Sequence, residues 1–266
     1  LPIGLILAME GCDAIVDPSQ TQHWFDLGLR VASLVHYGRS AYAVGTGQEG
    51  PLSPRGRKML QAFQQAGILL DVTHLCDQSF AEAMDCYDGP LLASPNNSRA
   101  LVPGQRQFTD DQLRQIIARD GVIGVACDAW MLLPGWKTGE SSREAVPMTA
   151  LADHIDHICQ LAGNSRHVAL GSDLDGGFGT EQCPGGLETI ADLQKLAHTL
   201  AGRGYRDEEL DGIFHGQWLR FFTAHLPQSE CKAVQHGPTR LAPSRAATQH
   251  TATQHTATQR EAPPCC

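Results

Sequence analysis

Four side chains that can bind a metal ion or carry a proton follow short apolar segments of the chain. Glu10, His36 and His74 each end such a segment in the first third of the sequence, and Asp173 ends a later one. Two imidazoles and a carboxylate are ligands that suit zinc, and a further carboxylate can transfer protons during hydrolysis. Taken singly, each residue is more typical of a helix cap, a loop contact or a satisfied histidine. Their matching positions at four segment ends favour one shared site.

The apolar segments are typical of buried strands, and segments of helical periodicity separate them. Strands are expected at Ile3–Met9, Val31–Val35, Ile68–Val72, Pro90–Ala93, Val122–Cys127 and His167–Gly171. Helices are expected at Ser53–Gln65, Gln78–Cys86, Asp110–Arg119, Met148–Ala162, Leu187–Ala201 and Asp207–Ala224. Unbroken apolar strands that alternate with helices predict a parallel sheet covered by helices. In a barrel of this class the carboxyl ends of the strands converge on one face, where catalytic groups sit.

The predicted fold is an α/β (β/α)8 TIM-type barrel of the metal-dependent hydrolase kind, with about six of its eight βα units present. The alternative is an open, doubly wound sheet. Because the chain starts directly inside a strand, we expect two N-terminal units to be missing. Residues 1–225 are predicted to form this partial barrel. Residues 226–266 are rich in Pro, Gln, Thr and Ala and are predicted to be a disordered, low-complexity tail.

Composition and short motifs exclude several other classes of function. With 20 Lys and Arg against 29 Asp and Glu, the net charge of −9 argues against binding to nucleic acid. No apolar run in the sequence is long enough for a membrane span and it contains no signal segment. The compartment stays open, because a targeting segment could lie upstream of Leu1, and a cytoplasmic location is the working guess. The nine cysteines are scattered without a CxxC pair, which favours reduced thiols. The segment Gly45–Gly50 fits GxGxxG but runs into Pro51 and does not join a strand to a helix, so a nucleotide site is not expected.

The motifs at the strand ends resemble the membrane (renal) dipeptidase family, in its bacterial branch. The matching segments, in order along the chain, are Leu7-Ala8-Met9-Glu10-Gly11, Val35-His36-Tyr37, Asp71-Val72-Thr73-His74, Arg106, and Gly171-Ser172-Asp173-Leu174-Asp175-Gly176. Order and spacing match over about Leu1–Phe222. The GSDLDG and DVTHL segments are fairly specific in combination, although each is weak alone.

This resemblance implies a zinc dipeptidase with two metal ions. Glu10 would bridge both ions and His74 would bind one of them. A metal-bridging hydroxide would attack the peptide carbonyl, and Asp173 would shuttle its proton to the leaving amine. His36 would bind the substrate and stabilise the oxyanion of the tetrahedral intermediate. Arg106 would hold the free carboxylate of the substrate, for which its planar guanidinium is suited.

Two departures from the family pattern predict that hydrolysis by this chain is impaired or absent. The family takes two further metal ligands from a His-x-Asp pair on a strand that we expect to be missing. It also places a histidine at the end of the fourth strand, where this chain has Pro95 in the segment Ala93-Ser94-Pro95-Asn96. Proline carries no metal-binding side chain, so only Glu10 and His74 remain of five ligands. Zinc sites use three or four protein ligands, so zinc occupancy here is doubtful.

The sequence leaves two other functions open. One is a non-catalytic remnant that keeps Arg106 and binds short peptides without metal. The other is a different barrel metallohydrolase, acting on lactams, phosphoesters or amidines. A dipeptide substrate is the expected partner, and a homodimer is an alternative that the sequence does not decide.

Overall fold

The computed structural model describes residues 4–174 and 176–227, and these form one sheet with its helices. The sheet has six parallel strands, β1 (Leu7–Met9), β2 (Leu29–Ala32), β3 (Leu69–Asp71), β4 (Leu91–Ala93), β5 (Val122–Ala126) and β6 (Val168–Ser172). Neighbouring strands pair in chain order from β1 to β6. The prediction of six parallel strands is confirmed. The strand bounds differ most at β1, which begins at Leu7 and not at Ile3, and at β2, which begins and ends earlier than expected. The predicted disorder of the tail falls on residues 226–266, which from 228 on lie outside the described residues.

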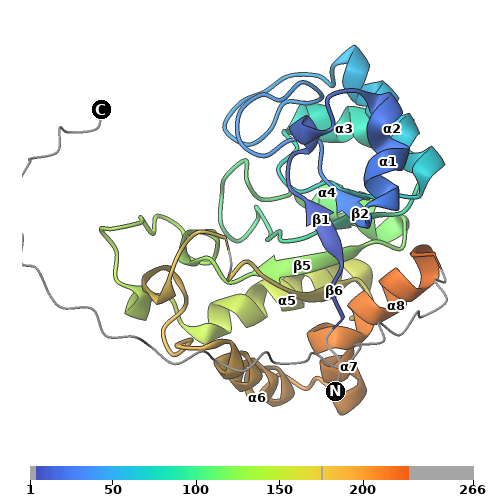
Figure 1. The fold of residues 1–266 in the computed structure, drawn as a ribbon. Coiled ribbons are helices and arrows are strands. Elements are labelled where there is room, and N and C mark those ends of the chain that lie inside the picture. The colour runs from blue at the N-terminus through green and yellow to red at the C-terminus, as the bar shows by residue number, and fades with distance from the viewer. Residues whose placement is uncertain (1–3, 175, 228–266) are drawn as a thin grey trace, which may run out of the picture. The chain divides into compact units, whose positions relative to one another are not determined.

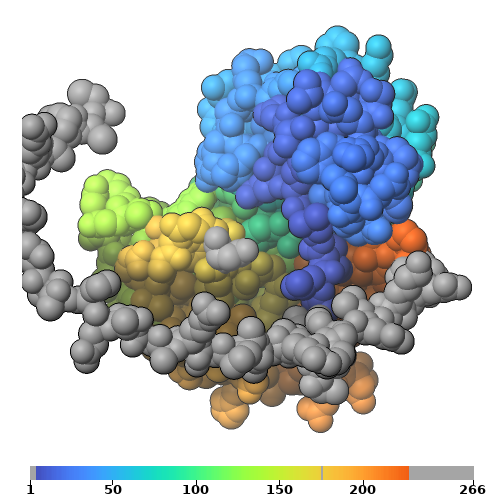
Figure 2. Space-filling model, viewed as in Figure 1, coloured from blue at the N-terminus to red at the C-terminus, as the bar shows by residue number. Residues whose placement is uncertain are grey.

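The strand order distinguishes the two folds that the sequence left open. A doubly wound sheet reverses direction at a switch point, so its spatial order differs from its chain order. An unbroken order from β1 to β6 is that of a barrel, in which each right-handed crossover adds the next strand on the same side. The fold is therefore part of a TIM-type barrel, and β1 and β6 are its two edges. In Figure 2 the dark-blue segment that carries β1 lies on the surface of this view, and Leu7 is 55% exposed.

Helices cover the sheet at both ends of the strand order. They are α1 (Thr21–Asp26), α2 (Pro54–Ala66), α3 (Asp77–Cys86), α4 (Asp110–Ala118), α5 (Met148–Ala162), α6 (Gln194–Gly202), α7 (Asp207–Asp211) and α8 (Gln217–His225). Figure 1 shows α1, α2 and α3 around the β1–β2 end and α5, α6 and α8 around the β5–β6 end. A single π turn, Gly212–Gly216, joins α7 to α8, so the predicted helix over Asp207–Ala224 is essentially continuous. None of the helices in these described ranges is long and apolar enough to cross a membrane.

Apolar strand residues are buried on both faces of the sheet, and each face belongs to its own apolar cluster. One set of alternating strand residues packs against the surrounding helices and includes Leu70, Ile123 and Val168. The opposite set packs against α8, where Phe221 is fully buried; it consists of Val31, Leu69, Leu92, Val122 and Ala169. Strands buried on two sides carry nearly continuous apolar sequence, which is the pattern that predicted them. The carboxyl ends of the strands remain free to carry polar residues.

His154 and His157 on α5 form hydrogen bonds to neighbouring elements of the fold. Nδ1 of His154 accepts a hydrogen bond from the backbone N–H of Ser98 at 3.1 Å, in the loop after β4. His157 contacts the carboxylate of Asp110 at the start of α4, with Nε2 and Oδ1 2.7 Å apart. These contacts fix α5 against the β4 loop and α4.

Acidification is expected to destabilise the fold partly through His154. Burial, with the charge of His157 adding to it, lowers the pKa of His154 from 6.5 to about 4. The imidazole of His154 is therefore protonated more readily in the unfolded chain than in the folded one. The free energy of unfolding keeps its full value above pH 6.5 and decreases as the pH falls toward 4. At about 1.4 kcal/mol per pKa unit the loss is roughly 3 kcal/mol.

His154→Gln tests this prediction, because glutamine keeps an acceptor for Ser98 but does not titrate. The free energy of unfolding, measured by urea titration across this pH range, should fall more steeply in the wild type than in the variant. Parallel curves for the two proteins would contradict the assignment.

Candidate active site at the carboxyl ends of the strands

The ends of β1, β2 and β3 bring Glu10, His36 and His74 together. Glu10 directly follows β1, and the two histidines follow β2 and β3 by a few residues. Oε1 of Glu10 lies 3.1 Å from Nε2 of His74 and 3.6 Å from Nε2 of His36. One potential ligand atom from each of the three residues lies within 4.8 Å of the other two. These are three of the four residues that the matching strand ends grouped in the prediction, and their donors can surround one cation.

The backbone at these strand ends is held in an unusual conformation. His74, Ser172 and Asp173 all have positive φ angles, of 69°, 47° and 65°, a region that residues other than glycine seldom occupy. Such residues cost on the order of 1–3 kcal/mol each and persist only where surrounding contacts enforce them. The turn that contains His74 is closed by the hydrogen bond from the N–H of Leu75 to the carbonyl oxygen of Val72, at 3.3 Å. The turns thus present their side chains at the rim of the sheet.

Charge and burial favour the protonation states that a metal ligand needs. The hydrogen bond with His74 lowers the pKa of Glu10, and although partial burial opposes this, the charge of His36 lowers it further. Burial lowers the pKa of His74 to about 4, against the opposing effect of its bond to Glu10. Near neutral pH, Glu10 is therefore an anion and His74 a neutral imidazole. These are the forms in which carboxylates and imidazoles bind metals.

Asp173 lies with Glu10 on the wall of a cavity of about 300 Å³ inside the strand ends. The cavity is also lined by Asp71 and by Ser94 and Pro95 after β4. Glu10 and Asp173 therefore face one shared space, although they come from the two edge strands of the sheet.

Asp71 is a residue of this cavity to which the sequence gave no role of its own. Burial raises the pKa of Asp71 to about 6, against hydrogen bonds from Thr73 and from the N–H of Ser94. Its Oδ1 accepts the N–H of Ser94 at 3.3 Å, so it ties the end of β3 to the end of β4. Its position in the DVTH segment was noted, but only the fold shows that its side chain turns inward.

Arg106 is buried next to the same cavity, and its two terminal nitrogens each donate to the carbonyl oxygen of Pro95 at 3.2 Å. Burial lowers its pKa, while the nearby charges of Tyr37, Asp173 and Asp71 act in the opposite direction. Pro95 itself lines the cavity at the end of β4 and offers no side-chain donor. Arg106 therefore lies beside the predicted site, where its guanidinium is bonded to the backbone of Pro95, two residues after the end of β4.

Tyr37 and Thr46 are two further contacts of the histidines, and the sequence assigned neither a function. The Tyr37 ring packs edge-on against His36, with centroids 4.7 Å apart, and against His74 at 5.1 Å. Oγ1 of Thr46 lies 2.9 Å from Nδ1 of His74. Tyr37 adjoins a predicted site residue and could have been suspected. Thr46 lies 28 positions before His74, and no local pattern connects them.

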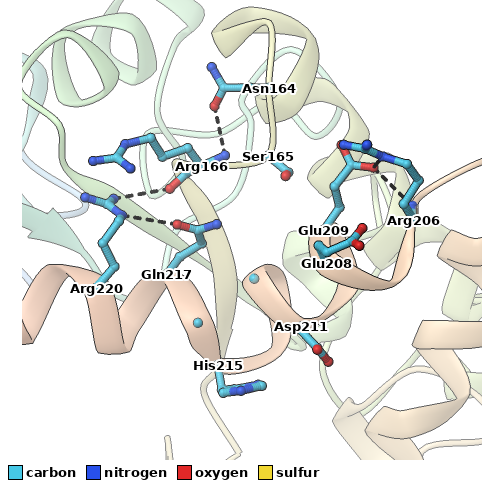
Figure 3. A pocket seen from close by; sticks show the side chains of 12 residues that line it. Asn164, Ser165, Arg166, Arg206, Glu208, Glu209, Asp211, His215, Gln217 and Arg220 are labelled. Carbon is cyan, nitrogen blue, oxygen red and sulfur yellow. Dashed lines mark hydrogen bonds and ion pairs between the residues drawn. The ribbon is translucent and has the colours of Figure 1, made fainter.

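A larger hollow, of about 670 Å³, lies elsewhere and has a different character. Figure 3 shows it between the segment Asn164–Arg166, which precedes β6, and the helical segment that runs from Arg206 to Arg220. Its charged side chains pair with near neighbours: Arg206 with Glu209, and Arg220 with Asp120 at 2.9 Å. It opens at the amino end of β6, whereas barrel enzymes use the carboxyl ends. The Glu10 cluster is therefore the stronger candidate for the active site.

Comparison with known proteins identifies the family. The sequence profile of the membrane dipeptidase family, peptidase family M19, matches residues 2–231. An uncharacterized dipeptidase of Schizosaccharomyces pombe is 28% identical over 223 residues, which are 82% of this chain and 52% of the relative. Dipeptidase aclJ of Aspergillus oryzae is 30% identical over 223 residues, 82% of this chain and 50% of the relative.

Solved structures of the same kind share the fold. A metallopeptidase of Rhodobacter sphaeroides, crystallised with a phosphinate mimic of the dipeptide L-Ala-D-Ala, superposes with a TM-score of 0.72 at 27% identity. The match covers 83% of this chain and 63% of that one. A second structure, of a dipeptidase of family M19, gives the same score and identity, with 83% and 65% covered. The chain spans about half the length of the curated relatives it matches. Over nearly all of its described length, this chain belongs to the membrane dipeptidase family of peptidases.

Proposed function

We propose that the chain acts as a metal-dependent dipeptidase, with zinc as the metal and dipeptides as substrates. The observation that carries the proposal is the cluster of Glu10, His36 and His74 at the carboxyl ends of three neighbouring parallel strands. Membership in a family of dipeptidases, and the fold shared with metallopeptidases, support the same reaction.

The donor set fits one divalent cation. An anionic carboxylate and two imidazoles, all within 4.8 Å of one another, are the ligand types and number that catalytic zinc sites use. A bound cation would act as a Lewis acid that polarises the peptide carbonyl and makes water a better nucleophile. The described residues do not fit a second cation equally well, because Pro95 stands where the family pattern has a histidine. We therefore propose a single-cation site in this chain.

His36 is proposed as the third ligand, beside Glu10 and His74. Two ligands hold zinc weakly, and Nε2 of His36 is the next donor, 3.6 Å from Oε1 of Glu10. The side chain of His36 is half exposed, at 50%, so it can move toward a cation without disturbing the core. This role differs from the one that the family resemblance implies, in which the imidazole stabilises the oxyanion.

His36→Ala is expected to lower zinc affinity by at least about 10-fold, the lower end of what removing even a supporting group of a metal site costs. The affinity is measured by competition with a chelator of known strength. His23→Ala is the matched control, because His23 is exposed on α1 and away from the cluster. If His36→Ala binds zinc normally but turns over dipeptide slowly, the oxyanion role applies and the ligand role is wrong.

Asp173 and Arg106 supply two further roles in the proposed mechanism. The carboxylate of Asp173 would accept a proton from the attacking water and return it to the leaving amine, which must be protonated to depart. Arg106 would bind the free carboxylate of the substrate by two parallel N–H···O bonds. If the site binds the free carboxylate of the residue that follows the scissile bond, that residue must be the last of the substrate. The site then selects dipeptides over longer peptides.

A substrate panel tests the proposed function. The purified chain, supplied with zinc, is assayed on L-Ala-L-Ala, L-Ala-D-Ala, the corresponding amides and Ala-Ala-Ala. Hydrolysis of free dipeptides, but not of amides or of the tripeptide, is the expected result. L-Ala-D-Ala is included because its phosphinate mimic is bound in the Rhodobacter sphaeroides relative. Tight binding of dipeptides without turnover would instead support a peptide-binding remnant, and no binding of either kind would reject both.

A further inference from the structure

The Gly45–Gly50 loop, whose glycine pattern resembles a nucleotide motif, lies between the two histidine-bearing strand ends. The N–H of Gly45 donates to the carbonyl oxygen of Gly38 at 2.6 Å, and the N–H of Gly38 donates to that of Thr46 at 2.9 Å. On its other side Gly45 forms a bridge with Leu75, the residue after His74. A Cβ atom on Gly45 would lie 2.1 Å from the carbonyl oxygen of His36, so only glycine fits there. The glycine permits close packing against the site, and no phosphate is needed to explain it.

Thr46, at the centre of this packing, contacts the inner nitrogen of His74. Its Oγ1 lies 2.9 Å from Nδ1 and 3.4 Å from the carbonyl oxygen of the same histidine. Both residues are buried, with 8% of Thr46 and 4% of His74 exposed. The outer nitrogen, Nε2, lies 3.1 Å from Oε1 of Glu10. The ring is thus held at both nitrogens, by a hydroxyl on one side and a carboxylate on the other.

A hydroxyl suits this position because it both donates and accepts hydrogen bonds. With the ring proton on Nε2, that nitrogen donates to Glu10 and the Thr46 hydroxyl donates to Nδ1. With the proton on Nδ1, that nitrogen donates to Oγ1, and the hydroxyl hydrogen turns to the carbonyl oxygen of His74. Only the second form leaves a lone pair on Nε2, which is the form that a metal ligand requires.

We propose that Thr46 is a positioning residue of the metal site, which aims Nε2 of His74 at Glu10 and accepts a hydrogen bond from Nδ1–H when Nε2 is a ligand. This inference rests on the proposed function, because a metal ion is what requires the lone pair on Nε2. It also explains why the Gly45–Gly50 loop packs against both histidine-bearing strand ends. Hydrogen-bond partners of ligating histidines fix the tautomer and ring orientation in metal sites generally.

The first test compares zinc affinities of Thr46→Val and Thr46→Ser in the full chain. Valine keeps the shape but has no hydroxyl, so affinity is expected to fall about 10- to 100-fold. Serine restores the hydroxyl and is expected to restore the affinity. Thr21→Val is the matched control, because Thr21 is also buried and its hydroxyl donates to the carbonyl oxygen of Pro18 at 2.7 Å. That control should bind zinc like the wild type.

The second test observes the ring proton of His74 directly and does not depend on a measured zinc affinity. In ¹⁵N NMR spectra of the zinc-loaded wild type, His74 should carry its proton on Nδ1, in slow exchange with water; His74→Gln assigns the signal. In Thr46→Val this proton should exchange fast, since its acceptor is gone.

The outcomes separate this inference from the proposed function. Normal zinc affinity in Thr46→Val, or a rapidly exchanging Nδ1 proton in the zinc-loaded wild type, would overturn the role of Thr46 and leave the metal site standing. Failure of the wild type to bind zinc would overturn the metal site, and with it the role of Thr46.

Discussion

Replacement of Asp173 by asparagine is expected to lower kcat for dipeptide hydrolysis by about 10²- to 10⁴-fold, the usual contribution of a general acid–base group. The amide keeps the size of the side chain but cannot accept a proton from water at neutral pH. Because Asp173 shares the cavity with Glu10 but is not one of the three clustered donors, zinc affinity should not change. A large fall in kcat at constant zinc content is therefore the signature of a proton carrier.

Two controls make this result specific to Asp173. Asp88→Asn makes the same chemical change at an exposed position and should leave both kcat and zinc affinity unaltered. Thermal unfolding of Asp173→Asn shows whether the protein stays folded when this residue, which has a φ of 65°, is replaced. A folded Asp173→Asn protein that hydrolyses dipeptides at the wild-type rate would exclude this carboxylate from the reaction.

Glu10→Gln is expected to have the largest effect of all, the loss of both zinc binding and hydrolysis. Glu10 is the only anion of the three-donor cluster, and its Oε1 is the atom nearest to both histidine rings. Glutamine keeps the shape and a carbonyl oxygen but removes the charge, and neutral amides are poor zinc ligands. Zinc content after dialysis, measured by atomic absorption, should fall to background.

The fold should tolerate Glu10→Gln, because 57% of the Glu10 side chain is exposed and it lies after an edge strand. The urea midpoint of the zinc-free variant should therefore match that of the zinc-free wild type. Glu49→Gln, in the loop behind the cluster, is the control for removing one carboxylate without touching the proposed ligands. Retention of zinc by Glu10→Gln would mean that other residues hold the metal.

Much of the fold was predictable because strand and helix periodicities are strong in this sequence. The helix over Met148–Ala162 was predicted to the residue, since its apolar face is long and Gly163 ends it in a left-handed conformation. The α-helix that was not predicted is α1, whose six residues are too few to show a clear helical period of apolar residues. The predicted helix over Leu187–Ala201 begins later, because Thr189 and Asp192 form a capping box that starts a 3-10 turn first.

The burial of the first strand was predicted less well. The run Ile3–Met9 is apolar enough for an interior strand, yet the ordered strand is short and its side chains are largely exposed. Pairing on one side only makes it an edge strand. The sequence shows that a strand is apolar, but its burial also depends on how many strands pair with it, which is a property of the whole sheet.

The grouping of Glu10, His36 and His74 was predictable because parallel strands end at one rim, so chain position translates into spatial position. The contact between Thr46 and His74 was not, because it depends on the path of a loop 28 residues away. The inward direction of Asp71 and the positive φ of His74 also depend on contacts between strands. Roles within the site, including that of His36, stay predictions until the variants are measured.

The most direct test of the central claim is a zinc titration of the metal-free wild-type chain, followed by calorimetry. Our account predicts one tight equivalent of zinc per chain, with dipeptide hydrolysis rising in proportion to the zinc bound. Absence of a saturable site, or a titration curve identical to that of Glu10→Gln, would contradict it.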